Sequence, residues 1–105
     1  MNIEGVKSKA GEAAALLKVM ANDRRLVVLC ELARGERTVG ELAAACSLGQ
    51  SALSQHLAKL RDAGVVTTRR QAQTIHYSLT GSAAGRVISL LNDIYCRPAR
   101  GRRPS

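Results

Sequence analysis

The sequence has almost no aromatic residues and no long apolar run. Phe and Trp are absent from its 105 residues, and the aromatic side chains are two tyrosines. A core must therefore be built from Leu, Val, Ile and Ala, which bury less area per residue than aromatic rings. No stretch approaches the roughly 18 apolar residues of a membrane span, and the amino terminus lacks the order of a signal peptide. We expect one small cytoplasmic domain.

Acidic residues are also scarce, and the number of cysteines is odd. Sixteen Lys and Arg stand against eight Asp and Glu, which gives a formal net charge of +8 and predicts a polyanionic partner. Four of the arginines lie in residues 97–105, which we expect to be a disordered tail. Three cysteines in a reducing compartment argue against a disulfide framework and favour buried, metal-binding or redox-active thiols.

Residues 38–64 have the pattern of a helix-turn-helix. Thr38 and Glu41 stand at the spacing of a capping box, and the small residues of 47–49 then interrupt the first helix. The second helix begins at about Gln50, and three leucines form its buried stripe: Leu53, Leu57 and Leu60. Its polar residues are candidates to read DNA in a major groove: Gln50, Ser51, Ser54, Gln55, His56 and Lys59. The competing interpretation is a merely solvated helix face.

Residues 65–79 are expected to form a β-hairpin with a basic tip. Both flanks are rich in β-branched residues, the second flank alternates, and the turn is expected at residues 71–72. A basic hairpin directly after a helix-turn-helix is typical of the wing of a winged helix. Arg69, Arg70 and Gln73 are then placed to contact the DNA backbone or minor groove. A hairpin that only covers the core would not explain two consecutive arginines at its tip.

Three further helices are expected, at about residues 9–20, 23–34 and 83–96. In the second of these, Cys30 and Ala33 are expected on the apolar stripe with Leu26 and Leu29. The last helix has a wide apolar band and, with the first, forms the natural interface of a homodimer. Residues 1–8 carry no periodicity and are expected to be a flexible amino terminus. The predicted fold is therefore mainly helical with a small β-hairpin wing, in one winged helix-turn-helix domain over residues 9–96.

Together these features resemble the ArsR/SmtB family of bacterial winged-helix repressors. The similarity covers about residues 9–96 and rests mainly on QSALSQHLAKLRDAGVV and on the wing that follows it. The resemblance implies a homodimer that represses transcription by binding inverted-repeat operators in double-stranded DNA, and that a chemical inducer releases. An enzyme is not expected, because no nucleophile–base pair, phosphate loop or catalytic metal cluster is visible.

The metal sites of the family do not match this sequence. Arsenic-type members carry a Glu-Leu-Cys-x-Cys pattern where this chain has alanines at residues 43–45. Zinc-type and nickel-type members use Asp and His along the terminal helix, where this chain has Asp93 and no histidine. We therefore expect no metal site and no cofactor.

Two cysteines instead match the branch of this family that senses persulfides and oxidants. In that branch one cysteine lies in a Leu-Cys-x-Leu context and another follows an aromatic residue near the chain end, as Cys30 and Cys96 do here. The resemblance implies that Cys30 and Cys96 are the redox-sensing pair. Closing them into a disulfide or polysulfide would move one helix relative to another and weaken operator binding.

Alternatives remain open at this point. Each thiol could be a buried small hydrophobe, which is the interpretation we give to Cys46. Cys30 and Cys96, with or without Cys46, could instead bind arsenite or another soft metal ion. A basic architectural DNA binder without an inducer is a third possibility. His56 and His76 have no metal-ligand neighbour at helical spacing and are treated as ordinary polar side chains.

Overall fold

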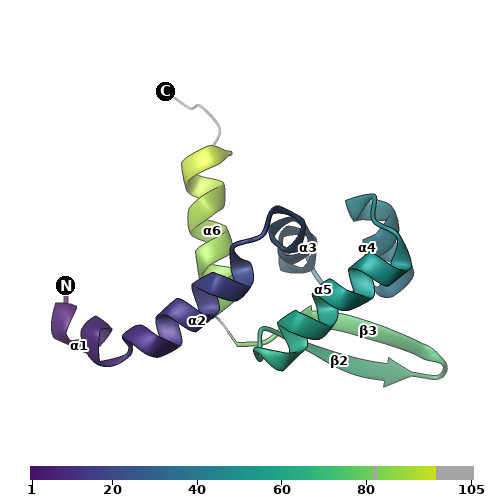
Figure 1. The fold of residues 1–105 in the computed structure, drawn as a ribbon. Helices are drawn as coiled ribbons and strands as arrows, with labels where there is room; N and C mark the ends of the chain where they lie inside the picture. The colour runs from purple at the N-terminus through teal and green to yellow at the C-terminus, as the bar shows by residue number, and fades with distance from the viewer. Residues whose placement is uncertain (82, 97–105) are drawn as a thin grey trace.

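The described part of the chain is mainly helical and contains one small antiparallel sheet. The computed structural model describes residues 1–81 and 83–96, so the expected tail at 97–105 lies outside the described residues. The helices in these residues are α1 (Ile3–Ser8), α2 (Ala10–Met20), α3 (Asp23–Ala33), α4 (Val39–Cys46), α5 (Gln50–Asp62) and α6 (Ala83–Tyr95). The strands are β1 (Arg37–Thr38), β2 (Val66–Gln71) and β3 (Thr74–Leu79). The predicted order of helices and hairpin is confirmed, with α1 and β1 added to it (Figure 1).

The helix-turn-helix consists of α4 and α5, and the predicted capping box begins it. The Thr38 hydroxyl accepts a hydrogen bond from the backbone N–H of Glu41 at 3.2 Å, and the Glu41 carboxylate accepts one from the backbone N–H of Thr38 at 2.9 Å. Ser47 follows α4 in the left-handed conformation with φ 54°, and Gly64 follows α5 with φ 74°. These two residues let the chain turn sharply where each helix ends.

The hydrophobic core lies between α3, α4, α5, the sheet and the first turns of α6. Its least accessible side chains, each less than 2% exposed, are Leu29, Leu42, Leu53, Leu57, Leu60 and Val28. The leucine stripe predicted on α5 is thus confirmed, but the stripe predicted on α3 is wrong in part. Cys30 and Ala33 are exposed, and the buried residues of α3 are Val28, Leu29 and Leu32. Because α3 packs against α4, α6 and β3 together, its buried face is set by neighbours that periodicity alone does not reveal.

The sheet has the order β1-β3-β2, and all its pairs are antiparallel. In the hairpin, Arg69 lies opposite His76 and Gln71 lies opposite Thr74. The turn is therefore at residues 72–73, one residue later than predicted, and Ala72 adopts a positive φ of 58°. Tyr77 and the apolar ends of the hairpin pack against the core, so the proximal half of the wing is anchored while the tip is exposed.

The amino-terminal segment contains a short helix where no regular structure was expected. The Asn2 side chain caps α1 by accepting a hydrogen bond from the backbone N–H of Gly5 at 2.9 Å, and no residue of α1 is buried. In Figure 1, α1 and α2 lie on one side of the molecule and the hairpin extends on the other, while α6 projects away from the helix-turn-helix. Within residues 1–81 and 83–96, no helix is both long enough and apolar enough to cross a bilayer.

Candidate nucleic-acid interface and thiol pair

The outer face of α5 presents a set of polar side chains to solvent. The leucine stripe of this helix is buried, which turns the remaining positions outward, as the 3.6-residue period requires. Five of the six candidate DNA contacts on the helix are exposed: Gln50, Ser51, Ser54, Gln55 and Lys59. The helix begins at Gln50, and Gly49 before it provides no side-chain cap, so its first-turn N–H groups can point toward an anion.

His56, the sixth candidate on α5, is placed differently. It is half-buried, and its Nδ1 atom has no hydrogen-bond partner among the described residues. Burial lowers the pKa of His56, and the positive charges of Arg25 and Arg24 lower it further. The imidazole therefore lies toward the start of α3 and is kept neutral there, unlike the exposed candidates on the same helix.

The first turn of α3 is connected to the end of α2 by an arginine. Arg25 Nε donates a hydrogen bond to the backbone carbonyl of Val19 at 2.6 Å, while the Asn22 side chain caps α3 by accepting from the N–H of Arg25 at 3.0 Å. A cation at a helix start is unfavourable for the helix dipole, and this carbonyl offsets that cost. Arg25 therefore has a structural role, and Arg24 beside it is exposed.

The two arginines of the wing lie on opposite faces of the hairpin. Adjacent residues of a strand point to opposite faces, and Arg69 shares its face with His76, the residue opposite it. Arg70 is exposed, and no ion pair or side-chain hydrogen bond of Arg70 is found within the described part of the chain. Gln73 lies in the turn and is also exposed.

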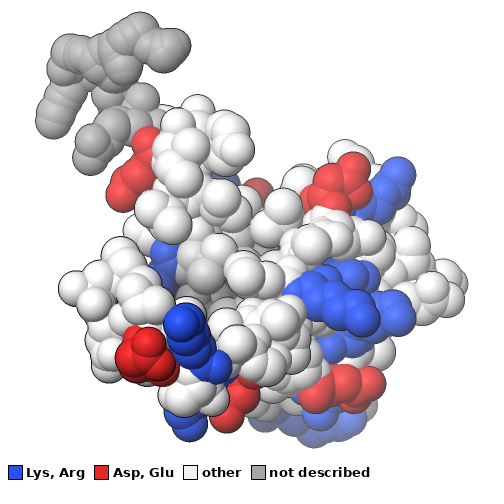
Figure 2. Space-filling model, turned by 60° about the vertical axis from the view of Figure 1, so that its left-hand side comes forward, with Lys and Arg blue, Asp and Glu red and all other residues white. Residues whose placement is uncertain are grey.

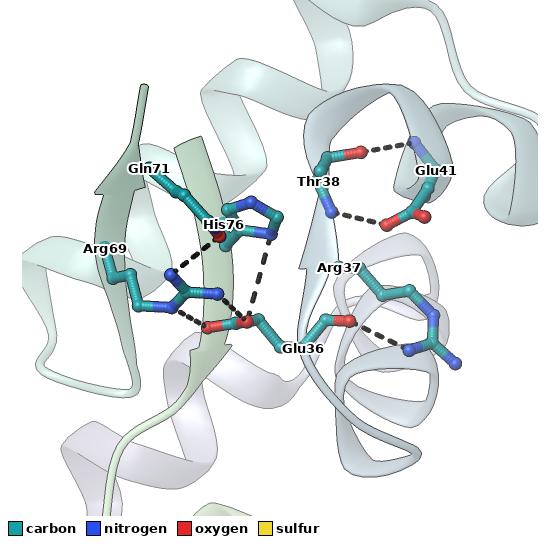
Figure 3. Close-up of polar contacts among 7 residues, drawn as sticks. All are labelled: Glu36, Arg37, Thr38, Glu41, Arg69, Gln71 and His76. Carbon is teal, nitrogen blue, oxygen red and sulfur yellow. Dashed lines mark hydrogen bonds and ion pairs between the residues drawn. The ribbon is translucent and has the colours of Figure 1, made fainter. Parts of the chain in front are cut away.

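Arg69 is bound to the carboxylate of Glu36, a residue that no sequence motif singles out. Its Nε and one terminal nitrogen donate to the two carboxylate oxygens of Glu36 at 3.0 and 2.7 Å, and the other terminal nitrogen donates to Gln71 at 3.1 Å (Figure 3). Nδ1 of His76 lies 3.9 Å from the same carboxylate. The hydrogen bond from Arg69 lowers the pKa of Glu36, so this carboxyl stays ionised at neutral pH. Finding Glu36 would have required predicting β1, a strand of two residues.

The structure brings the predicted thiol pair into one neighbourhood. Cys30 lies on α3 and Cys96 directly after α6, both are exposed, and the two helices pack against each other. The pKa of the Cys30 thiol is raised by desolvation, and the negative charges of Cys96 and Glu31 raise it further. Cys30 and Cys96 thus lie on or directly after two helices that pack together, α3 and α6.

Cys46 was assigned to the core, and it lies at the edge of that core. It is half-buried, packs against the core, and lines a cavity of about 240 Å³ between the start of α3 and the end of α4. Desolvation raises its pKa, and Glu31 and Cys30 add to the rise. Within residues 1–81 and 83–96, no group of three or more His, Cys, Asp and Glu side chains is arranged to hold a metal ion.

Large apolar side chains are exposed on the helices at both ends of the described chain. Leu17 on α2 is 54% exposed, and Leu90, Ile94 and Tyr95 on α6 are 56%, 59% and 80% exposed. On the face of the molecule drawn in Figure 2, Lys and Arg side chains lie in several places, with Asp and Glu side chains between and beside them. The exposed apolar side chains of α2 and α6 thus form an apolar surface on these helices.

Comparison with known proteins agrees with this geometry. The family described as "Bacterial regulatory protein, arsR family" matches residues 22–68. The transcriptional activator HlyU of Vibrio cholerae serotype O1 is 47% identical over 97 residues, which cover 92% of this chain and 90% of HlyU. The crystal structure of the transcriptional repressor BigR from Xylella fastidiosa superposes with a TM-score of 0.86 at 41% identity, covering 91% of this chain and 98% of BigR. The homodimeric winged helix-turn-helix domain of Mb0332 from Mycobacterium bovis gives a TM-score of 0.75 at 31% identity, covering 84% and 82%.

Proposed function

Because the chain belongs to the ArsR family of bacterial regulatory proteins and is a DNA-binding regulator of transcription, we propose that it is a homodimeric repressor whose operator affinity falls when Cys30 and Cys96 become covalently linked. The inducer is a reactive sulfur species or an oxidant. The observation that carries this proposal is the packing of α3, which bears the exposed Cys30, against α6, which the exposed Cys96 follows.

The exposed face of α5 is the part that reads base edges. Its amide side chains can pair with adenine, its hydroxyls can pair with several bases or with phosphate, and Lys59 can bind guanine or phosphate. Arg70 and Gln73 of the wing contact the DNA backbone beside this helix. His56 supports the position of α5 from within the helix packing, because its imidazole is half-buried.

The exposed apolar residues of α2 and α6 form the dimer interface. One copy of a winged helix reads one half-site, and two copies related by a two-fold axis read an inverted repeat. The homodimeric relative from Mycobacterium bovis supports this arrangement. The spacing of the two α5 helices then depends on how α6 sits against the rest of each subunit.

The switch follows from the helices that the two thiols join. The Cys30 thiolate attacks the outer sulfur of an organic persulfide, which yields a Cys30 persulfide and releases the organic thiol. The Cys96 thiolate then attacks the Cys30 sulfur, forms a Cys30–Cys96 disulfide and releases hydrosulfide. This bond ties α3, which packs against α4 and α5, to the end of α6. It therefore changes the separation of about 34–36 Å that two successive major grooves require of the α5 helices.

The test begins with selection of a binding site from a random duplex library, in which an inverted repeat is expected. An equal preference for all sequences would instead support an architectural DNA binder. An organic persulfide should then lower the affinity for the selected duplex, and mass spectrometry should find a peptide crosslinked through Cys30 and Cys96. Cys30→Ser and Cys96→Ser should both abolish the response, with Cys46→Ser as the matched control. Release of DNA by either pair mutant on treatment would contradict the switch.

A further inference from the structure

The ion pair between Glu36 and Arg69 crosses the middle strand of the sheet, on the face that carries His76. Glu36 precedes β1 at one edge, Arg69 lies on β2 at the other edge, and the two side chains meet over His76 of β3 (Figure 3). Adjacent strands lie about 4.8 Å apart, so only long side chains can bridge the two outer strands. The pair therefore holds Arg69 back toward β1 rather than outward from the hairpin.

The contacts in this pair are those that arginine makes with a phosphate group. Two parallel N–H donors of Arg69 bind the two oxygens of one anion at 3.0 and 2.7 Å, which is the bidentate fork used for both carboxylates and phosphates. The side-chain oxygen of Gln71 accepts a hydrogen bond from the other terminal nitrogen of Arg69. Glu36 also neutralises the charge that would draw Arg69 to DNA, whereas Arg70, on the opposite face, has no such partner among the described residues.

We propose that Glu36 limits the affinity of this protein for DNA by occupying the arginine fork that a backbone phosphate would otherwise bind. The proposal rests on the wing lying against DNA as described above. Arg70 and Arg69 then differ in function although they are consecutive in sequence. Arg70 contributes a phosphate contact in the wild-type chain, and Arg69 contributes one only when Glu36 is removed.

The charged and titratable groups beside Glu36 do not bind the Arg69 guanidinium as the Glu36 carboxylate does. Arg37 follows Glu36 but points to the other face of β1, and its guanidinium donates to the Glu36 backbone carbonyl at 2.9 Å rather than to the carboxylate. Glu41 is engaged in the capping box with Thr38. His76 adds a weaker contact at 3.9 Å. Glu36 is thus the carboxylate that holds Arg69.

The test compares Glu36→Gln with wild type in binding a fluorescein-labelled random-sequence duplex, measured by anisotropy at several salt concentrations. Glu36→Gln should bind roughly threefold tighter or more at 50 mM salt, because each wing gains a phosphate contact. The slope of log affinity against log salt should steepen by about 0.9 for each wing, so between 50 and 200 mM the affinity should fall about 3.5-fold further for one wing and about 12-fold further for both wings of a dimer. Glu4→Gln, in an exposed pair on α1, changes the net charge equally and is the matched control.

A double-mutant cycle tests whether Arg69 is the source of the tighter DNA binding expected for Glu36→Gln. Arg69→Gln alone should change the affinity little, and in the Glu36→Gln background it should return the affinity and the salt slope to wild-type values. Arg70→Gln should weaken binding in both backgrounds. The proposal is overturned if Glu36→Gln binds no tighter than Glu4→Gln, or if Arg69→Gln alone weakens binding as much as Arg70→Gln. A wild-type chain that binds no duplex overturns the proposed function together with this one, and circular dichroism verifies that each variant is folded.

Discussion

At Cys30, desolvation and the surrounding charges oppose formation of the reactive thiolate. Its pKa is raised by desolvation, by Cys96 and by Glu31, and that of Cys46 is raised by desolvation and by Glu31 and Cys30. Because the thiolate is the nucleophile, this raised pKa should slow the reaction of Cys30 with oxidants at neutral pH.

Glu31 is the residue through which this reactivity can be tuned without touching a thiol. Its side chain is 21% exposed and lies 3.8 Å from Arg34. In a Cys46→Ser, Cys96→Ser background, Glu31→Gln should lower the pKa of Cys30 and so speed its alkylation by iodoacetamide at pH 7 to 8. Below the pKa the rate should rise about tenfold per pH unit in both proteins, with the Glu31→Gln curve displaced to lower pH. Superimposed curves would contradict this account.

At the scale of single elements, the capping box is the contact that starts the helix-turn-helix. Thr38→Ala removes the hydroxyl that accepts from the Glu41 N–H and should lower the free energy of unfolding by about 1 kcal/mol, within a range of about 0.5–2 kcal/mol. Urea denaturation followed by circular dichroism measures this difference. Thr38→Ser keeps the hydroxyl and is the control, so an equal loss in both variants would show that the Thr methyl group matters more than the cap.

The same box makes stability depend on pH in a defined direction. The hydrogen bond from the Thr38 backbone lowers the pKa of Glu41 in the folded state. A folded-state pKa below the unfolded one stabilises the protein above the ordinary carboxyl range, near pH 4.3, and this contribution is lost as pH falls through the folded-state pKa. Glu41→Gln mimics the protonated form, so wild type should be the more stable protein at pH 7 and the two should converge toward pH 3. A difference that is constant with pH would refute this.

The elements that the sequence predicted best are those with strong local signals. Each of these signals can be recognised from a short stretch of sequence: the capping box, the leucine stripe of α5 and the β-branched flanks of the wing. The wing turn was misplaced by one residue because its tip contains no Gly, Asn or Asp, and the residue with positive φ is Ala72. Glu36 was missed for another reason: its contact with Arg69 joins residues 33 positions apart through a strand too short to predict.

The same contrast holds for the thiols. Motif resemblance paired Cys30 with Cys96, and the packing of α3 on α6 supports their proximity. Helical periodicity alone put Cys30 on the buried stripe, whereas it is exposed. Periodicity finds a buried face when one neighbour dominates, but α3 packs against α4, α6 and β3, and these neighbours together decide which of its residues are buried.

For the whole molecule, the proposed function requires two copies, which we expect to meet at the exposed end of α6. Ile94 is 59% exposed on a helix that projects away from the helix-turn-helix (Figure 1). Ile94→Glu would place a charge in the apolar interface and should shift the protein from dimer to monomer in sedimentation velocity at micromolar concentration. Affinity for an inverted repeat should then fall by orders of magnitude, because one subunit retains one half-site. The same exchange at Ile75, an exposed residue of the wing, should leave the dimer intact. If Ile94→Glu also remained a dimer, the two subunits would have to associate through another surface.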